Sequence, residues 1–276
     1  MVKKLLLSVL GCLLALFSTG CTGCNRSPAQ APLPEGSPAS SPEPAGKLFA
    51  LRYGISRFPA SQIFANPGTE YQLPFHWLFF LVDLPGKVLL VDTGFTDPGY
   101  IPRFGIEYTA PRAILEELGY NPGQVTDIIL THTHFDHIGG VRDYPNATLH
   151  LFRVEYEQFL RQPGNASLKT YLQQHPALKL YTGDYKPAPG ITVHKAGGHT
   201  SGSAVVYITL NGETVVLTGD EAYLEENVHR VAPIGAYADL EANRNFLEEL
   251  HTGGLPFYTF HSPKIVTGEQ PWQRLR

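Results

Sequence analysis

Four residues with metal-binding side chains lie within six positions in the middle of this sequence. They are His132, His134, Asp136 and His137, in the segment THTHFDHIGG. The apolar run TDIILT at 126–131 leads directly into them and is predicted to be a β-strand. Because alternate side chains of an extended chain point to the same side, His132 and His134 can reach one ion. A turn into a helix would carry Asp136 and His137 toward a second ion. The alternative is a solvent-exposed, histidine-rich loop that holds no metal.

Three further segments contain residues that could complete a site for two metal ions. His199 lies in the glycine-rich turn GGHTSGS, Asp220 ends the predicted strand TVVLTGD, and His261 follows the apolar run PFYTF. A carboxylate at the end of a strand can bridge two ions about 3.5 to 4 Å apart, and this is the role expected of Asp220. His251 is the rival of His261, but it ends an amphipathic helical pattern, so His261 is preferred.

The ligands of the predicted site are limited to nitrogen and oxygen atoms. All three cysteines, Cys12, Cys21 and Cys24, precede the expected folded domain, so no thiol is available there. Neutral imidazoles and carboxylates suit zinc, iron or manganese. We therefore expect two divalent metal ions, with zinc as the first choice and iron, manganese or cobalt as alternatives.

Strand and helix patterns alternate along the chain from residue 47 onward. Strands are predicted at 76–84, 87–92, 126–131, 147–152, 191–196, 203–210 and 214–220. Helices are predicted at 111–119, 154–160, 167–175 and 239–251. Pro85-Gly86 and Asn211-Gly212 have the turn chemistry of hairpins. This alternation indicates an α/β fold with two sheets covered by helices.

The first 46 residues are expected to lie outside the folded domain. Residues 1–20 have the pattern of a signal peptide, with two lysines, a short apolar run and small residues. Residues 21–46, rich in Pro, Ser and Ala, are predicted to form an extended tether before a single metal-binding domain at 47–276. Cys21 resembles the lipidated cysteine of bacterial lipoproteins, although Ser18 departs from that pattern. We expect export to the periplasm or cell envelope with a lipid anchor at Cys21; ordinary cleavage and secretion is the alternative.

Composition and charge exclude other classes of protein. The sequence is 43% hydrophobic and 17% charged and has a net charge of −4, which is typical of a globular domain. No basic patch is visible, so binding to nucleic acid is not expected. Contact with a membrane is expected only through the lipid anchor.

The order of the candidate ligands resembles that of the metallo-β-lactamase fold superfamily. HTHFDH, GGHTSGS, the Gly-Asp pair at 219–220 and a late histidine follow one another between about residues 51 and 263. The resemblance implies a four-layer αββα sandwich with two metal ions bridged by Asp220. One ion would be bound by His132, His134 and His199, and the other by Asp136, His137 and His261. His261 is the weakest match, because this chain has Thr-Phe-His-Ser where the family usually has Pro-Gly-His-Asp.

Asp92 in the segment LVDTG matches another motif of the family, at the end of a predicted strand. The resemblance implies that Asp92 orients a metal ligand without binding metal itself. The alternative is an ordinary turn-forming aspartate before Thr-Gly.

Two features indicate a branch within the superfamily. The bridging Asp220 argues against the true β-lactamases, which lack that carboxylate. The segment GDEAYLEEN at 219–227 is similar to that of the N-acyl homoserine lactonases, in which a tyrosine follows the bridging aspartate by three residues, as Tyr223 does here. Those enzymes also have a phenylalanine in the histidine motif, matched by Phe135, which is expected either to line a substrate channel or to fill the core. An N-acyl homoserine lactone or a similar lactone is therefore the expected substrate. The alternatives are a hydrolase of another ester, a thioester or a β-lactam, and a lipoprotein that binds a ligand without catalysis.

The resemblance and the ligand types together imply a hydrolytic mechanism. Water that bridges two divalent ions has a lowered pKa, so hydroxide is available to attack a lactone carbonyl. Tyr223 is expected to donate a hydrogen bond to the oxyanion, and Asp136 to donate a proton to the leaving ring oxygen. The alternative for Tyr223 is a packing residue in the core.

Overall fold

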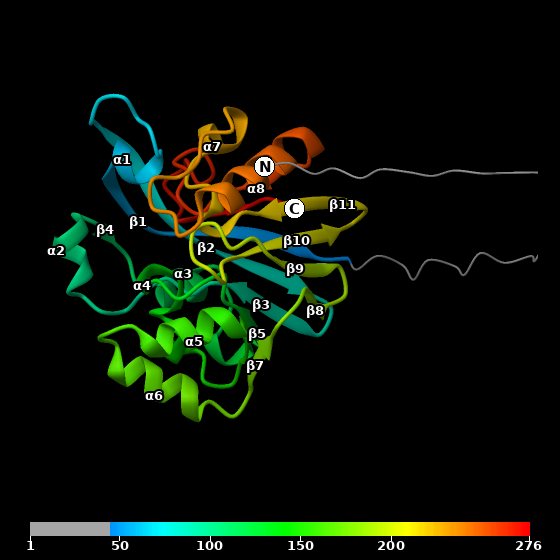
Figure 1. Ribbon diagram of the computed structural model, residues 1–276. Coiled ribbons are helices and arrows are strands. Elements are labelled where there is room, and N and C mark those ends of the chain that lie inside the picture. The colour runs from blue at the N-terminus through cyan, green and yellow to red at the C-terminus, as the bar shows by residue number, and fades with distance from the viewer. Residues whose placement is uncertain (1–44) are drawn as a thin grey trace, which may run out of the picture. The chain divides into compact units, whose positions relative to one another are not determined.

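The computed structural model describes residues 45–276, which form two β-sheets with helices on their outer faces (Figure 1). The predicted signal peptide, Cys21 and all but the last two residues of the predicted tether lie outside the described residues. None of the helices between residues 45 and 276 has the length and apolar character needed to span a bilayer.

The first sheet has eight strands and combines antiparallel with parallel pairing. Its strands are β1 (Lys47–Pro59), β2 (Gln72–Leu84), β3 (Lys87–Val91), β4 (Glu107–Tyr108), β5 (Asp127–Ile129), β6 (Thr148–Phe152), β7 (Leu178–Tyr181) and β13 (Trp272–Arg274). Their order is β13-β1-β2-β3-β5-β6-β7, and β4 pairs with β1. From β3 to β7 the strands run parallel, so the carboxyl ends of β3 and β5 meet at one edge of the sheet.

The second sheet has five strands. They are β8 (Tyr185–Ala188), β9 (Ile191–Lys195), β10 (Ala204–Leu210), β11 (Glu213–Leu217) and β12 (Phe257–Tyr258), in the order β12-β11-β10-β9-β8. The two hairpins predicted from turn chemistry are confirmed, because β2 pairs antiparallel with β3 across Pro85-Gly86 and β10 with β11 across Asn211-Gly212. The second sheet ends in a parallel pair, β11 with β12.

Helices cover the outer faces of both sheets. They are α1 (Ala60–Ile63), α2 (Tyr100–Phe104), α3 (Pro111–Glu117), α4 (Phe135–Ile138), α5 (Arg153–Arg161), α6 (Ala166–Gln174), α7 (Glu225–His229) and α8 (Leu240–Gly253), with 3-10 turns η1 (Pro122–Gln124), η2 (Val141–Asp143) and η3 (Gly219–Glu221). In Figure 1, α5 and α6 lie on one side of the paired sheets and α7 and α8 on the other. The four-layer αββα arrangement expected from the motifs is therefore confirmed.

The alternation of side chains along β2 explains how the layers are held together. Phe79 and Leu81 pack with the core under α3 and α4, whereas Leu78, Phe80 and Val82 pack with the core between the two sheets. Successive side chains of a strand point to opposite faces, so the part of β2 from 77 to 82, which is apolar at every position, must be covered on both sides. A third, smaller core lies between the second sheet and helices α7 and α8.

The longest strand that the sequence patterns failed to predict is β1. It pairs with β2 along almost its whole length and has β13 on its other side. Its apolar pattern is interrupted by Arg52, Gly54 and Arg57, which hides the strand in the sequence. The Arg52 guanidinium donates to the backbone carbonyl of Val266 at 2.7 Å, so this charge is accommodated by the C-terminal segment.

Candidate metal centre

The candidate ligands lie together because the strands that precede them, in both sheets, end at the same edge of the fold. β5 leads into the HTHFDH segment, and the turn between β9 and β10 carries His199. In the second sheet Leu217 of β11 and Tyr258 of β12 are paired in parallel register, and Asp220 and His261 each follow three residues later. The backbone N–H of Ala204 donates to the Thr131 carbonyl at 2.9 Å and joins the two sheets beside the centre.

The first group of candidate ligands consists of His132, His134, His199 and Asp220. Nδ1 of His134 lies 3.0 Å from Nε2 of His132 and 2.9 Å from Nε2 of His199. Oδ2 of Asp220 lies 3.7 Å from Nε2 of His132 and 3.5 Å from Nε2 of His199. His134 is exposed and the other three side chains are buried, so the group opens to solvent on one side.

The second group consists of Asp136, His137, Asp220 and His261, all of them buried. Nε2 of His137 lies 3.3 Å from Oδ2 of Asp136 and 3.2 Å from Oδ1 of Asp220. Nε2 of His261 lies 3.2 Å from the same Oδ1 of Asp220. Asp220 therefore presents one oxygen to each group, which is the geometry that a bridging carboxylate requires.

The spacing of these atoms fits metal ions. Ligand atoms about 2.0 to 2.1 Å from one tetrahedrally coordinated ion lie about 3.3 Å from one another. The pairs in hydrogen-bond or ion-pair contact lie 2.9 to 3.7 Å apart in the first group and 3.2 to 3.8 Å apart in the second, and all ligand atoms of each group lie within 4.8 Å of one another. In addition, Nε2 of His137 is buried with no hydrogen-bond partner. A buried polar atom without a partner is costly, and a metal ion would satisfy it.

Hydrogen bonds on the far side of three imidazoles aim their free nitrogens at the centre. Nδ1 of His199 donates to the carbonyl of Ala236 at 2.7 Å, and Nδ1 of His261 donates to the carbonyl of His76 at 2.9 Å. A carbonyl oxygen can only accept, so in both rings the proton is on Nδ1 and the lone pair is on Nε2. Burial lowers the pKa of His199 to about 4, which keeps its imidazole neutral and able to bind metal.

Asp92 fixes the third imidazole. Its carboxylate lies 2.6 Å from Nδ1 of His137, and it accepts from the N–H of Thr131 at 2.8 Å and the Thr131 hydroxyl at 2.7 Å. Asp92 is fully buried and has a left-handed backbone with φ of 63°. Such a conformation is uncommon outside glycine and marks positions that the surrounding structure constrains. These contacts match the supporting role expected for Asp92 and exceed what a simple turn requires.

Two buried glutamates that the sequence reasoning missed hold the histidine loops. Glu221 accepts from the backbone N–H groups of Gly198 and His199, both at 3.0 Å, and from Nδ2 of Asn243 at 2.8 Å. Glu155 accepts from the Thr133 N–H at 2.9 Å and from its hydroxyl at 2.6 Å. Burial raises the pKa of Glu221. No sequence pattern pointed to Glu221, because its donors come from the His199 turn and from Asn243, which are about 20 residues away in the chain.

Gly198 is required by this arrangement. A Cβ atom at Gly198 would lie 2.4 Å from Oε2 of Glu221 and 2.6 Å from the backbone of Asn243. The glycine therefore lets the His199 turn approach Glu221 closely enough for its backbone to donate to the carboxylate.

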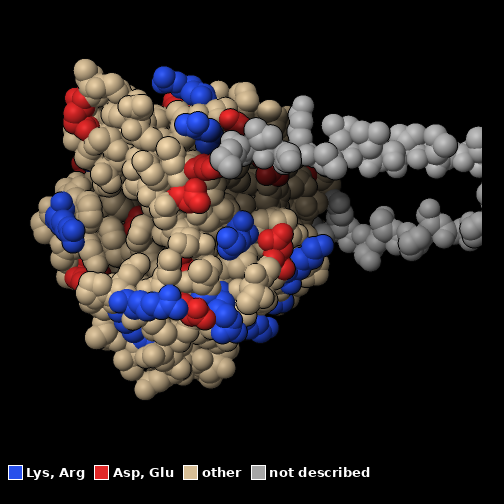
Figure 2. Space-filling model, viewed as in Figure 1, with Lys and Arg blue, Asp and Glu red and all other residues tan. Residues whose placement is uncertain are grey.

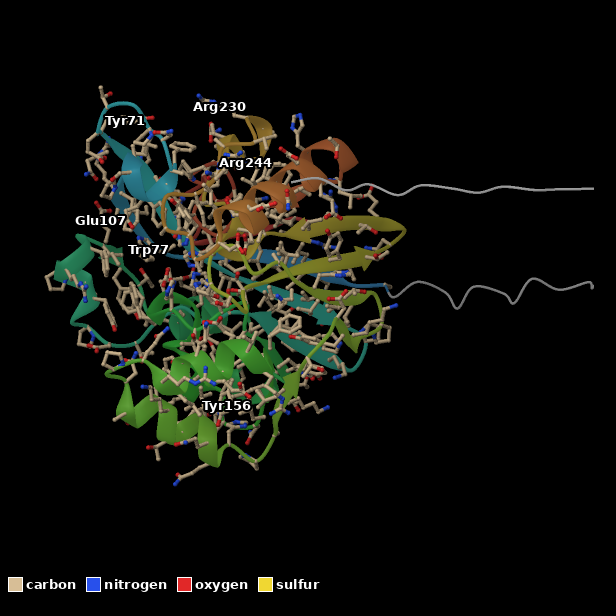
Figure 3. All side chains as sticks on the ribbon, viewed as in Figure 1. Tyr71, Trp77, Glu107, Tyr156, Arg230 and Arg244 are labelled. Carbon is tan, nitrogen blue, oxygen red and sulfur yellow. The ribbon has the colours of Figure 1, made fainter. Side chains whose placement is uncertain are left out.

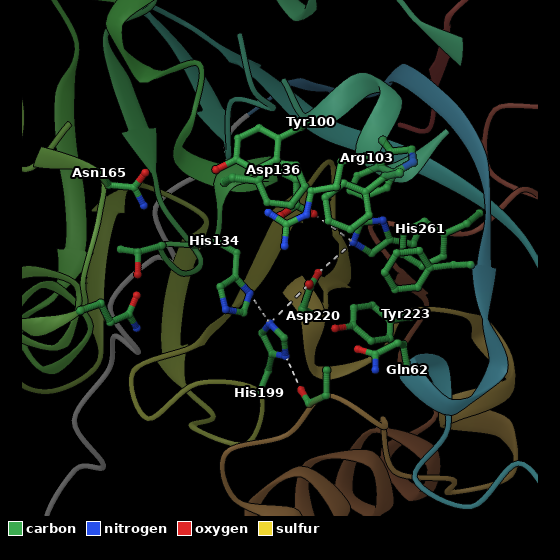
Figure 4. Close-up of a pocket in the computed structure, with 18 residues that line it drawn as sticks. Gln62, Tyr100, Arg103, His134, Asp136, Asn165, His199, Asp220, Tyr223 and His261 are labelled. Atoms are coloured by element: carbon green, nitrogen blue, oxygen red, sulfur yellow. Dashed lines mark hydrogen bonds and ion pairs between the residues drawn. The ribbon is translucent and has the colours of Figure 1, made fainter. Parts of the chain in front are cut away.

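Five of the seven candidate ligands line a cavity of about 370 Å³ (Figure 4): His134, Asp136, His199, Asp220 and His261. Its aromatic lining comprises Phe58, Phe75, Trp77, Tyr100, Phe104, Phe135 and Tyr223. Trp77 lies inside the molecule with 2% of its surface exposed, whereas Tyr71, 45% exposed, projects at the edge (Figure 3). A concave, largely apolar site with a few converging polar groups is typical of a small-molecule pocket.

The structure shows where the residues lie for which the sequence left alternatives open. His261 belongs to the centre, whereas His251 is exposed in the last turn of α8. Phe135 lines the cavity and stacks on Tyr100, with ring centroids 3.9 Å apart. Tyr223 also lines the cavity, and its ring centroid lies 5.3 Å from that of His261. In Figure 4 its hydroxyl points toward Asp220, not into the core.

Comparison with known proteins agrees with this geometry. The family model described as the metallo-beta-lactamase superfamily matches residues 78–265. The chain is 30% identical over 188 residues to the N-acyl homoserine lactonase AiiA of Bacillus thuringiensis subsp. kurstaki, covering 62% of this chain and 73% of the relative. It is 30% identical over 209 residues to the N-acyl homoserine lactonase of Bacillus cereus, covering 69% of this chain and 82% of the relative.

Solved structures have the same fold. A quorum-quenching N-acyl homoserine lactone hydrolase has 26% identity and a TM-score of 0.68, with 80% of this chain and 93% of that chain covered. AidC, a dizinc quorum-quenching lactonase solved with a product, has 23% identity and a TM-score of 0.64, with 79% and 88% covered.

The fold, the two ligand groups and the family match establish the class of this protein. It belongs to the metallo-β-lactamase superfamily and is a metal-dependent hydrolase that uses divalent metal ions.

Proposed function

We propose that this protein hydrolyses lactones, with N-acyl homoserine lactones as substrates and two zinc ions in the centre. The observation that carries the proposal is the placement of Tyr223. Three residues beyond the bridging Asp220, it lines the cavity beside the metal ligands with its hydroxyl turned toward them. The proposal is supported by the lactonase relatives and by an aromatic cavity suited to an acyl group.

Zinc is favoured by the chemistry of the ligands. Five histidines and two carboxylates in two groups of four, with spacings near those of a tetrahedron, suit zinc better than the octahedral ions. When two divalent ions are bound, they lower the pKa of bound water toward neutrality and polarise a carbonyl group. Elemental analysis of protein purified from zinc-supplemented cells should give about two zinc ions per chain; another metal in that amount would contradict the choice of zinc.

The residues of the chain supply the remaining chemistry. As the attacking oxygen bonds to the lactone carbonyl carbon, the Tyr223 hydroxyl donates a hydrogen bond to the carbonyl oxygen, where negative charge develops. Burial raises the pKa of Tyr223 well above its ordinary value, so the hydroxyl keeps its proton. Asp136 takes the proton of the attacking water on its carboxylate and returns it to the ring oxygen when the ring C–O bond breaks. The product is a hydroxy acid.

The proposal is tested by a panel of substrates with the zinc-loaded, full-length protein. N-acyl homoserine lactones of increasing chain length should be opened with release of a proton, which a pH indicator detects. Asp220→Ala, purified in the same way, is the control for metal-dependent turnover. Hydrolysis of thioesters or β-lactams by an enzyme that opens none of the lactones would refute the lactonase function.

We also propose that the protein is exported and anchored in the cell envelope through a lipid on Cys21. The support is the sequence around Cys21, where an apolar run and small residues precede the cysteine and a Pro-rich segment follows it. The full-length protein should incorporate a fatty-acid probe and partition into detergent, and Cys21→Ala should do neither. Export of an unlabelled wild-type protein would favour ordinary secretion, and labelling of Cys21→Ala would place the lipid elsewhere.

Nucleic acid is not a proposed partner. On the face shown in Figure 2, acidic side chains lie among the basic ones of residues 45–276.

A further inference from the structure

Helix α2 forms one wall of the catalytic cavity. Three of its five residues, Tyr100, Arg103 and Phe104, line that cavity together with the metal ligands. The helix ends at Gly105, whose φ of 59° is a conformation that glycine adopts without strain. None of these residues belongs to a motif in the sequence, so only the folded structure shows that α2 is part of the cavity.

The aromatic residues of α2 are fixed against α4. Phe135 contacts both aromatic residues, and its ring centroid lies 3.9 Å from that of Tyr100 and 5.1 Å from that of Phe104. The Tyr100 and Phe104 centroids are 6.4 Å apart, so the three rings form a compact cluster. Aromatic rings are rigid and bury large apolar areas, and the cluster therefore gives α2 a defined position over the cavity.

Arg103 is a cation in this wall without an acidic partner. Its guanidinium lies over the Phe104 ring, 5.3 Å from the centroid, and makes no ion pair or side-chain hydrogen bond with any residue between 45 and 276. In Figure 4 the Arg103 side chain reaches into the cavity, on the opposite side from Tyr223. A planar guanidinium with free N–H groups is suited to bind a carboxylate with two parallel hydrogen bonds.

The charge balance of the cavity favours an anionic ligand. The acidic side chains that line it are Asp136 and Asp220, and both belong to the metal centre. Two divalent ions outweigh these two carboxylates, and Arg103 adds a further positive charge. Low-dielectric aromatic walls strengthen the attraction between such a cavity and an anion.

We propose that Arg103 determines substrate specificity by binding a carboxylate carried on the acyl part of the substrate, away from the lactone ring. The inference rests on the proposed lactonase function and names a class of substrate for the same site: lactones whose acyl group ends in a carboxylate. The aromatic cluster of Phe104, Phe135 and Tyr100 forms the apolar surface beside the acyl chain, and Arg103 binds the charged end of that chain.

The test compares two substrates that differ only in this charge. One is N-octanoyl homoserine lactone, and the other has an acyl chain of equal length that ends in a carboxylate. The kcat/KM ratio of the charged to the neutral lactone is measured for the wild type, Arg103→Gln and Arg103→Glu. The matched control is Arg153→Gln, which removes another exposed arginine that does not line the cavity.

The wild type should prefer the charged lactone, and added salt should reduce the preference. Arg103→Gln should lower the ratio by about tenfold, the effect of one charge-assisted hydrogen-bonded pair at a partly exposed site. Arg103→Glu should reverse the preference and favour the neutral lactone, because like charges repel, and Arg153→Gln should keep the wild-type ratio. Zinc content should be equal in all variants.

Two outcomes would overturn the subsite, and a third concerns the function on which it rests. A ratio that stays within about twofold in Arg103→Gln refutes the role of Arg103, as does an equal fall in Arg153→Gln. If the wild type opens neither lactone, the lactonase function fails. The role of Arg103 is then tested with p-nitrophenyl esters of the same two acyl chains. The kcat/KM ratios should change in the variants as described for the lactones. If the wild type does not hydrolyse these esters either, the proposed carboxylate subsite is refuted as well.

Discussion

Replacing Asp92 by asparagine tests whether the support behind His137 controls metal binding. The Asp92 carboxylate accepts from the N–H and the hydroxyl of Thr131 and lies 2.6 Å from Nδ1 of His137. Because a carboxylate has no proton to give, it holds the proton of His137 on Nδ1 and leaves Nε2 free toward Asp136 and Asp220. Asparagine has nearly the same shape and also tolerates the left-handed backbone of residue 92.

The asparagine amide cannot satisfy all of these donors. If its oxygen keeps the Thr131 N–H, its NH₂ group faces Nδ1 of His137, which must then lose its proton to Nε2, the atom that should bind metal. If the amide is turned over, two donors face each other at Thr131. Loss of such a supporting partner weakens metal binding by about 10- to 100-fold, which is about 1.4 to 2.8 kcal/mol.

The assay is a zinc titration of the metal-free protein in competition with a chromophoric chelator, fitted to two sites. Asp92→Asn should weaken the site of His137 and leave the site of His132, His134 and His199 near its wild-type affinity. Asp184→Asn, an exposed aspartate whose partner His194 is remote from the centre, is the matched control. Wild-type affinity at both sites in Asp92→Asn would refute the reasoning, and equal weakening of both would indicate a general loss of structure.

Three further predictions follow from other contacts. Tyr223→Phe should lower kcat on the best lactone by about 10²- to 10³-fold with little change in KM or zinc content, because one donor to the oxyanion is lost; wild-type kinetics would make Tyr223 a packing residue. Asp220→Ala should lose at least one of two zinc ions in elemental analysis together with hydrolysis, and full zinc content would contradict its bridging position. Burial raises the pKa of Asp127, but hydrogen bonds from His150 and Lys87 outweigh burial and hold that pKa below its usual range. The Asp127 carboxylate therefore stabilises the fold above about pH 4, and this stabilisation is lost as the pH falls further. Asp127→Asn should reduce the free energy of unfolding by about 1 to 3 kcal/mol at pH 7 and by less at pH 3, as measured by urea denaturation of metal-free protein; an equal reduction at both pH values would contradict the assignment.

The sequence by itself determined the parts of the centre that are local in the chain. His132 and His134 are two residues apart just beyond β5, and Asp136 and His137 lie in the short helix α4, so local backbone geometry separates them into two pairs. The same local logic predicted both hairpins, because a tight turn between two apolar runs fixes their pairing. Residue type and position at turns and strand ends added His199, Asp220 and His261 as candidates, and the family resemblance assigned them to the two ions.

Only the tertiary structure decided which distant residues meet. The parallel register of β11 with β12 places His261 beside Asp220, whereas His251, ten residues earlier, remains on the surface of α8. Glu221 and Arg103 had no pattern of their own in the sequence, because their roles depend on the His199 turn and on the cavity wall formed by α2. Pairing between strands far apart in the chain depends on packing over the whole fold, so a local sequence pattern cannot predict it.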